Sequence, residues 1–270
     1  MFHTNLWNCT LASTILSMNR KSQSDAITIY WCPGRFVLEE ESWNMLYREP
    51  EPAINYIFDN SHEKAEVRKC PGARAAFKNV FSIKATHEER IAFPPDYLLS
   101  VSQKDEQTFP LELPGKLQIL KQRQSEYPGH ANLVYNMSWY FFASEPVEAK
   151  MTAPYYPPTT PTPGASLFPG EFNIGLWYRP FNLEYSVPLN AKEFMIRPDD
   201  PLFFLEIKTD KKVVFKRYNN TSRLDSIAGE YISSTNMYGA NKPLLDRYRL
   251  SKQSRLPNIV LDEIQANLIS

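Results

Sequence analysis

Apolar and polar side chains alternate along much of the chain with a period of two, which is the spacing of half-buried β-strands. The clearest example follows Pro180, where one face of the predicted strand is apolar (Phe181, Leu183, Tyr185 and Val187). Runs rich in β-branched and aromatic residues predict further strands at 26–32, 80–85, 97–102, 116–120 and 193–197, and at 131–144 either one bent central strand or two strands. A weaker run at 53–58 also favours a strand. These patterns indicate a chain built mainly from short strands.

Two features of the pattern predict how strands connect. The alternation already holds at 174–178, so a strand begins before Pro180, which marks a bend or a change of partner strand. Residues 201–208 and 212–218 are apolar runs separated only by Thr-Asp-Lys. So short a polar turn between two such runs predicts a β-hairpin.

Helical spacing is confined to a few places. Residues 38–50 have acidic residues in the first turn and apolar residues three to four positions apart, and a proline ends this predicted helix. Residues 70–79 predict a turn that enters a short helix. From residue 220 the chain is predicted to be helical. The clearest part is 242–255, where one side is basic and the other apolar (Leu244, Leu245 and Tyr248).

Composition narrows the fold class. Twenty-two prolines against nine glycines, with 13% aromatic residues, fit many short strands joined by rigid loops. We therefore predict a mainly β, single-domain β-sandwich or jelly-roll-like (cupin-like) fold with a few short helices. Residues 1–25 are an N-terminal extension, residues 26–219 the β-rich core, and residues 220–270 a helical C-terminal tail that packs on the core. Met18 is a hypothetical true start, which would leave residues 1–17 outside the native protein.

The stretch at 153–170, APYYPPTTPTPGASLFPG, is unusually rich in proline and favours an extended, rigid conformation. Strand patterns resume directly after it, so it is predicted to be an ordered arm rather than a linker between domains. Tyr155 and Tyr156 lie in this arm, where burial in the core is not dictated by the pattern. An interface role for the two tyrosines is therefore one prediction of the sequence.

Charge and cysteine content exclude several classes of function. Thirty basic residues balance thirty acidic ones, so the chain has no long-range field to attract nucleic acid or an anionic membrane. No apolar run is long enough to cross a bilayer. Three cysteines cannot form a complete disulfide framework, which favours a reducing compartment and a cytoplasmic location.

Catalytic motifs are scarce: the chain has no Gly-x-Ser-x-Gly, phosphate-binding loop or dinucleotide fingerprint. His87 and Glu89, with a distant His130, supply the residue types of a site with two histidines and one carboxylate. On a cupin-like barrel such a site would hold Fe²⁺ and use 2-oxoglutarate. Solvated polar residues, with no cofactor, are the competing interpretation.

The stretch PGEFNIGLWYRPFNLEYSV raises a second candidate site at Trp177 and Arg179. Arg179, at a strand end, could bind a carboxylate or phosphate with both guanidinium arms, in a binding or a catalytic role. It could equally stack on Trp177 or pair with an acid such as Glu171. The structural role is favoured, with the neighbouring aromatic residues forming a wall of the core.

Four stretches, WCPGRFVLEEESWNMLYREPEP, KCPGARAAFKNVFSIKA, PGEFNIGLWYRPFNLEY and FFLEIKTDKKVVFKRY, together resemble an uncharacterised family encoded by tailed, T4-like and often marine bacteriophages, with distant bacterial relatives. The resemblance covers about residues 26–255 and is most specific at 169–180. It implies a viral origin and synthesis inside a host cell. The family has no established activity, so the resemblance carries over no catalytic residue.

Two functions follow from the sequence, and whether the protein is an enzyme stays open. The first is a phage-associated, non-catalytic binding or structural module, either within the virion or outside it, whose Pro/Tyr-rich arm contacts a protein partner or another subunit. The alternative is a cupin-like, non-haem iron-dependent oxygenase with His87, Glu89 and His130 as ligands and Arg179 holding an acidic cosubstrate.

Overall fold

The computed structural model describes residues 25–34, 46–59, 66–93, 95, 98, 117–119, 127–156, 158–237 and 243–269. These residues are mainly β, with several sheets, a few helices and helices at the C-terminal end. The predicted β-sandwich-like fold class is therefore confirmed. Of the helix predicted at 38–50 only residues 46–50 are described, of the strand predicted at 97–102 only residue 98, and of the N-terminal extension only residue 25.

One sheet, called sheet A here, has the strand order β13-β1-β6-β10-β8, and β5 also pairs with β6. Its strands are β1 (Ala26–Pro33), β5 (Leu117–Ile119), β6 (His130–Ala143), β8 (Ser166–Leu167), β10 (Pro180–Pro188) and β13 (Lys212–Arg217). The register between β10 and β6 shifts from Ser138 to Tyr135, so two residues of β6 form a bulge. The predicted strand at 131–144 is thus one bent strand at the centre of the sheet.

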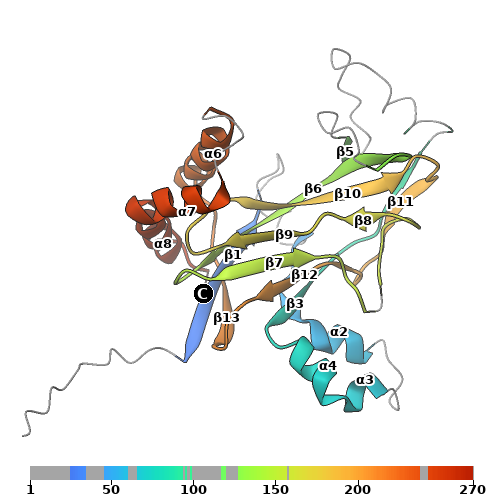
Figure 1. The fold of residues 1–270 in the computed structure, drawn as a ribbon, viewed down its shortest axis with the longest axis horizontal. Coiled ribbons are helices and arrows are strands. Elements are labelled where there is room, and N and C mark those ends of the chain that lie inside the picture. Colours follow the sequence, from blue (N-terminus) through green and yellow to red (C-terminus); the bar gives the residue numbers. More distant parts are fainter. Residues whose placement is uncertain are drawn as a thin grey trace, which may run out of the picture.

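The second sheet, sheet B, has the order β2-β3-β12-β7-β9. Its strands, all antiparallel to their neighbours, are β2 (Glu51–Pro52), β3 (Val80–Lys84), β7 (Glu148–Thr152), β9 (Gly170–Asn173) and β12 (Pro201–Ile207). A separate antiparallel pair joins β4 (Glu89–Ala92) to β11 (Glu193–Ile196). Sheets A and B pack face to face (Figure 1). Trp139 of β6 and Phe203 of β12 meet between them, with ring centroids 5.4 Å apart.

Helices pack on part of the outer face of each sheet (Figure 1). The helices are α2 (Ala53–Asp59), α3 (Glu66–Lys69), α4 (Pro71–Ala76), α6 (Ser222–Met237), α7 (Leu244–Gln253) and α8 (Leu256–Ala266). Leu224 of α6 and Ile264 of α8 are buried in a second core against sheet A. Ile57 of α2 and Phe77 after α4 form a third core with Phe204 of sheet B.

The predicted hairpin at 201–208 and 212–218 is wrong, although both strands exist as β12 and β13. β12 pairs with β3 and β7 in sheet B, whereas β13 runs parallel to β1 at the edge of sheet A. The residues between them carry the chain from one sheet to the other. Because β12 is buried on both faces, its backbone groups need partners along both edges, and β3 and β7 already supply them.

The predicted strand at 53–58 is also wrong, because this segment forms the helix α2. Its buried residues are Ala53, Tyr56 and Ile57, a spacing of three and four that places them on one face of a helix. The neighbouring prediction is confirmed. Residues 70–79 contain α4, with Pro71 in its first turn and the Cys70 thiol accepting a hydrogen bond from Ala73 N–H at 3.4 Å.

Two predictions about side-chain faces need correction. Residues 174–176 form a turn, and β10 starts at Pro180, so the alternation before the proline does not belong to a strand. In α7 the buried side is formed by Tyr248 and Ser251, while Leu245 is 68% exposed. Of the predicted apolar side only Tyr248 is buried, where its ring packs against Trp177, whereas Leu244 and Leu245 are exposed.

Candidate functional site

The candidate at Trp177 and Arg179 is built on the turn between β9 and β10. Ile174 anchors this turn through two backbone hydrogen bonds. Its N–H donates to Val147 O, and its carbonyl accepts from Ala143 N–H at the end of β6. Gly175 is required here, because a Cβ atom would lie 2.3 Å from the carbonyl oxygen of Glu145. The turn therefore holds the next residues in a fixed position.

Arg179 stacks on two aromatic rings. Its guanidinium carbon lies 4.6 Å from the ring centroid of Phe172 and 5.4 Å from that of Trp177. Its Nε donates to Pro180 O at 3.4 Å. Glu171, the acid named as an alternative partner, accepts a hydrogen bond from Lys208 Nζ at 2.6 Å. The geometry agrees with the stacking interpretation of Arg179, and Trp177 is buried as a wall residue.

Helix α7 completes this site, which we call the tryptophan cluster (Phe172, Trp177, Arg179, Arg247 and Tyr248). The Arg247 guanidinium lies 5.7 Å from the Trp177 ring, and the Tyr248 ring packs edge-on against it at 5.8 Å. Tyr248 accepts a hydrogen bond from Asn173 N–H at 2.8 Å. Burial raises the pKa of Tyr248 to about 12, so this hydroxyl stays neutral at physiological pH.

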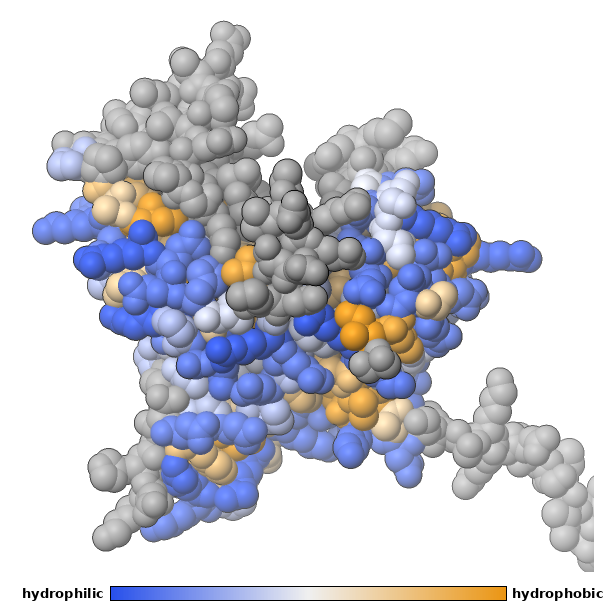
Figure 2. All heavy atoms as spheres, turned by 180° about the vertical axis from the view of Figure 1, so that it is seen from behind, coloured by the Kyte–Doolittle hydropathy of each residue, from blue (hydrophilic) through white to orange (hydrophobic). Residues whose placement is uncertain are grey.

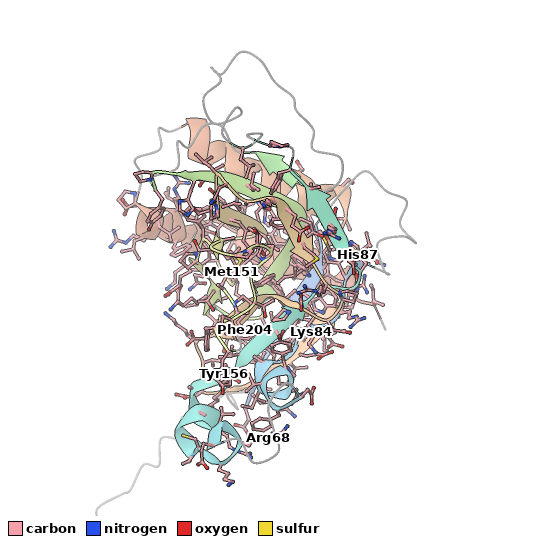
Figure 3. All side chains as sticks on the ribbon, turned by 90° about the vertical axis from the view of Figure 1, so that its right-hand side faces the viewer. Arg68, Lys84, His87, Met151, Tyr156 and Phe204 are labelled. Atoms are coloured by element: carbon pink, nitrogen blue, oxygen red, sulfur yellow. The ribbon has the colours of Figure 1, made fainter. Side chains whose placement is uncertain are left out.

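The two tyrosines of the Pro-rich arm lie over the third core. Tyr155 stacks on Phe77 with ring centroids 5.5 Å apart and packs edge-on against Phe204 at 5.2 Å. It is nevertheless 50% exposed, and Tyr156 is 45% exposed. Figure 3 shows Tyr156 between Phe204 and the helices that carry Arg68. We call Tyr155 and Tyr156, with their supports Phe77 and Phe204, the tyrosine platform.

The rest of the arm runs along the body of the protein. β8 pairs with β10 at the edge of sheet A, and Leu167 of this short strand is buried. Tyr56 Oη lies 3.3 Å from Thr159 Oγ1, which joins the arm to α2. The described residues of the arm therefore pair and pack with the body of the protein, as expected for an ordered arm, and lie between sheet B, the third core and sheet A.

The three predicted metal ligands are not brought together. His87 Nε2 lies 3.6 Å from Glu89 Oε2, and Tyr135 donates a hydrogen bond to the same carboxylate oxygen at 2.8 Å. His130 instead lies 3.3 Å from Pro128 O through its Nδ1. Among the described residues, no group of three or more His, Cys, Asp or Glu side chains could hold a metal ion.

Sequence reasoning missed a polar cluster in the second core. Burial raises the pKa of the Cys32 thiol to about 12, although Tyr178 and Tyr218 are in hydrogen-bond contact with it. The two tyrosine hydroxyls lie 2.9 Å apart, and Tyr178 donates to Asn220 Oδ1 at 3.3 Å. A neutral, buried thiol is a poor nucleophile, so this cluster joins sheet A to its helices rather than forming a reactive site.

No local sequence pattern could have identified these sites, because each site joins residues that are far apart in the chain. Phe77 supports Tyr155, and Arg247 lies beside Trp177. The alternating pattern predicts which residues are buried but does not say which strands are neighbours.

Comparison with known proteins returned no matching family model, curated protein or solved structure. Within the part of the chain that the structure describes, no helix is long and apolar enough to cross a membrane.

Proposed function

We propose that the protein is a non-catalytic binding or structural module that contacts a protein partner or a second copy of itself through the tyrosine platform. The resemblance to a phage family supports adding that it is phage-associated and made in the cytoplasm of an infected cell. The observation that carries the proposal is Tyr155, which is fixed between two aromatic rings while half of its surface faces solvent.

A tyrosine held in this way suits an interface. Tyrosine offers a large apolar surface and a polar hydroxyl, and tyrosine is enriched among the residues that dominate binding energy. Because Phe77 and Phe204 already restrict the ring of Tyr155, its contact with a partner would cost little conformational entropy. Tyr156, the next residue along the chain, is 45% exposed and offers a second tyrosine to a partner.

Photo-crosslinking tests this proposal. We would replace Tyr156 with the photo-crosslinking amino acid benzoylphenylalanine in the cell that produces the protein. As a control, the same replacement would be made at Tyr127, which lies outside the platform and is 59% exposed. We expect a specific protein or a second copy to be crosslinked from position 156 and not from 127. Equal yields from both positions would contradict the proposal, as would no crosslink from either.

Sedimentation velocity separates the two kinds of partner. If the platform binds a second copy, Tyr156→Ala should weaken self-association of the purified chain, while Tyr127→Ala should leave it unchanged. Circular dichroism would confirm that both variants are folded. Self-association that is unaffected by Tyr156→Ala, with no crosslink from position 156, would overturn the proposal.

A further inference from the structure

The outer edge of β13 is a second surface, which uses none of the residues of the tyrosine platform. Lys212 N–H donates to Asp25 O and Tyr218 N–H donates to Trp31 O, so the even-numbered residues of β13 direct their backbone groups toward β1. Along a strand these directions alternate. The N–H and carbonyl groups of Val213 and Phe215 therefore point away from sheet A, and no described residue pairs with them.

The end of the described chain already uses this edge. Leu268 pairs antiparallel with Tyr218, Ile269 N–H donates to Arg217 O at 3.0 Å, and Asn219 N–H donates to Asn267 O at 2.9 Å. Arg217 is odd-numbered, so this contact confirms the direction of the outer edge. Residues 267–269 thus show that β13 accepts an antiparallel neighbour, and they leave the positions of Val213 and Phe215 open.

An open cleft lies beside Phe215. Its lining is apolar at Phe215, Leu268 and Ile269 and charged at the remaining residues (Glu49, Lys216 and Arg217). Leu268 is 37% exposed and Ile269 is 42% exposed. Apolar side chains gather on the face drawn in Figure 2, on the side of the molecule where β13 lies. An added strand would therefore find both backbone partners and an apolar surface.

Charge decides which strand fits. Lys212 and Lys216 are exposed and lie on the same face of β13. If a second copy paired antiparallel at Val213 and Phe215, Lys212 of each copy would stand directly opposite Lys216 of the other. Like charges placed directly opposite each other are unfavourable, whereas opposite charges at these positions are favourable.

We propose that β13 binds an extended protein segment that adds an antiparallel strand at Val213 and Phe215, with acidic side chains four positions apart facing Lys216 and Lys212. The three residues between the acids lie opposite Phe215, Val214 and Val213 and are apolar or β-branched. Main-chain hydrogen bonds supply affinity in this mode of recognition, and the two charge pairs fix the register. The competing interpretation is that the two lysines only prevent unwanted strand pairing at a free sheet edge, in which case the protein would bind no such segment.

A fluorescent peptide that contains Glu-Val-Thr-Val-Glu, flanked by Ser and Gly, tests the proposal by anisotropy with the full chain. We expect saturable binding. Replacing both glutamates with lysine should weaken it by about tenfold or more, since two favourable pairs become repulsive. N-methylation of both valines should abolish binding, because it removes the backbone donors.

The matched protein variant is Lys212→Glu with Lys216→Glu, two exposed positions where substitutions are expected to change stability little, which circular dichroism would check. This variant should no longer bind the peptide with two glutamates and should bind the peptide with two lysines. Amide exchange at Val213 and Phe215 should be fast in the free protein and slow in the complex. The proposal would be overturned if the peptide did not bind, or if the N-methylated peptide bound equally well. It would also be overturned if amide exchange at Val213 and Phe215 became slow with rising protein concentration alone, because that result would assign the edge to a second copy.

Discussion

Arg179 shows how a residue that looks catalytic in the sequence becomes part of a wall. Its guanidinium lies over Phe172 and Trp177, so the planar cation covers apolar surface that would otherwise face water. The sequence identified Trp177 as its neighbour because the two are close in the chain. Phe172 and Arg247 entered the cluster through strand pairing and helix docking, which the local pattern does not encode.

Arg179→Ala should lower the free energy of unfolding by about 1–2 kcal/mol, because the stacking and the apolar cover are lost together. Arg179→Lys should recover only part of this, since an ammonium group lacks the planar face. Urea denaturation measures both. Arg249→Ala, which removes an exposed pair with Asp246 on α7, is the control and should change stability by less than about 0.5 kcal/mol. Equal effects at positions 179 and 249 would contradict the stacking role.

The buried thiol and tyrosines predict sensitivity to alkaline pH. The pKa of Cys32 is raised from 9.0 to about 12, and that of Tyr248 from 10.0 to about 12. The unfolded chain therefore loses these protons first. The contribution of both groups is fully present below pH 9 and is lost as pH rises toward 12, at a slope of about 1.4 kcal/mol per pH unit for each group.

Urea unfolding at a series of pH values checks this sign. Between pH 9 and 10 the unfolded chain ionises the Cys32 thiol and a fraction of each tyrosine whose pKa burial raises, so the thiol supplies one part of the slope, at most about 1.4 kcal/mol per pH unit. Cys32→Ala should therefore flatten the slope in this interval, whatever its effect on the absolute stability. A slope that is unchanged by the substitution would show that the Cys32 thiol does not titrate differently in the two states.

At the scale of elements, the sequence predicted where most strands lie but not how they pair. Period-two alternation identified β10, and runs of β-branched and aromatic residues identified β1, β6 and β11, because each of these strands has one face or both in a core. The error at 201–218 arose because a short polar turn satisfies a hairpin and a crossover between sheets equally well. The error at α2 arose because its few apolar residues fit both periods, and only contact with the third core selects the helix.

Two glycine substitutions test whether the β9–β10 turn is as tightly constrained as its geometry indicates. Gly175→Ala should destabilise the protein by about 2 kcal/mol or more, because its Cβ would meet backbone atoms of Glu145 and Pro146 that cannot move independently. Gly229→Ala, on the exposed side of α6 with open space around it, should stabilise the protein by about 0.5–1 kcal/mol. Thermal or urea denaturation gives both signs, and a neutral Gly175→Ala would contradict the close approach.

At the scale of the whole molecule, the three cores cannot melt separately, because they share strands. Alternate residues of β1 point to opposite sides: Trp31 lies in the core between the sheets, and Tyr30 lies in the core under the C-terminal helices. β12 divides in the same way between Phe203 in the first core and Phe204 in the third. Loss of either helical layer would expose one face of a central strand.

This sharing predicts one cooperative unfolding transition. Ile264→Ala, a fully buried position on α8, should cost about 2–5 kcal/mol. β1 and β6 contribute residues to both the first and the second core, so the loss of stability should affect both cores. The urea midpoint measured by tryptophan fluorescence, to which Trp31 and Trp139 contribute, should therefore fall by the same amount as the midpoint measured by helical circular dichroism. Leu245→Ala, 68% exposed on α7, is the control and should shift neither signal. If the helical signal fell first while fluorescence kept its midpoint, the C-terminal helices would be a separate folding unit, and residues 26–269 would not form one domain.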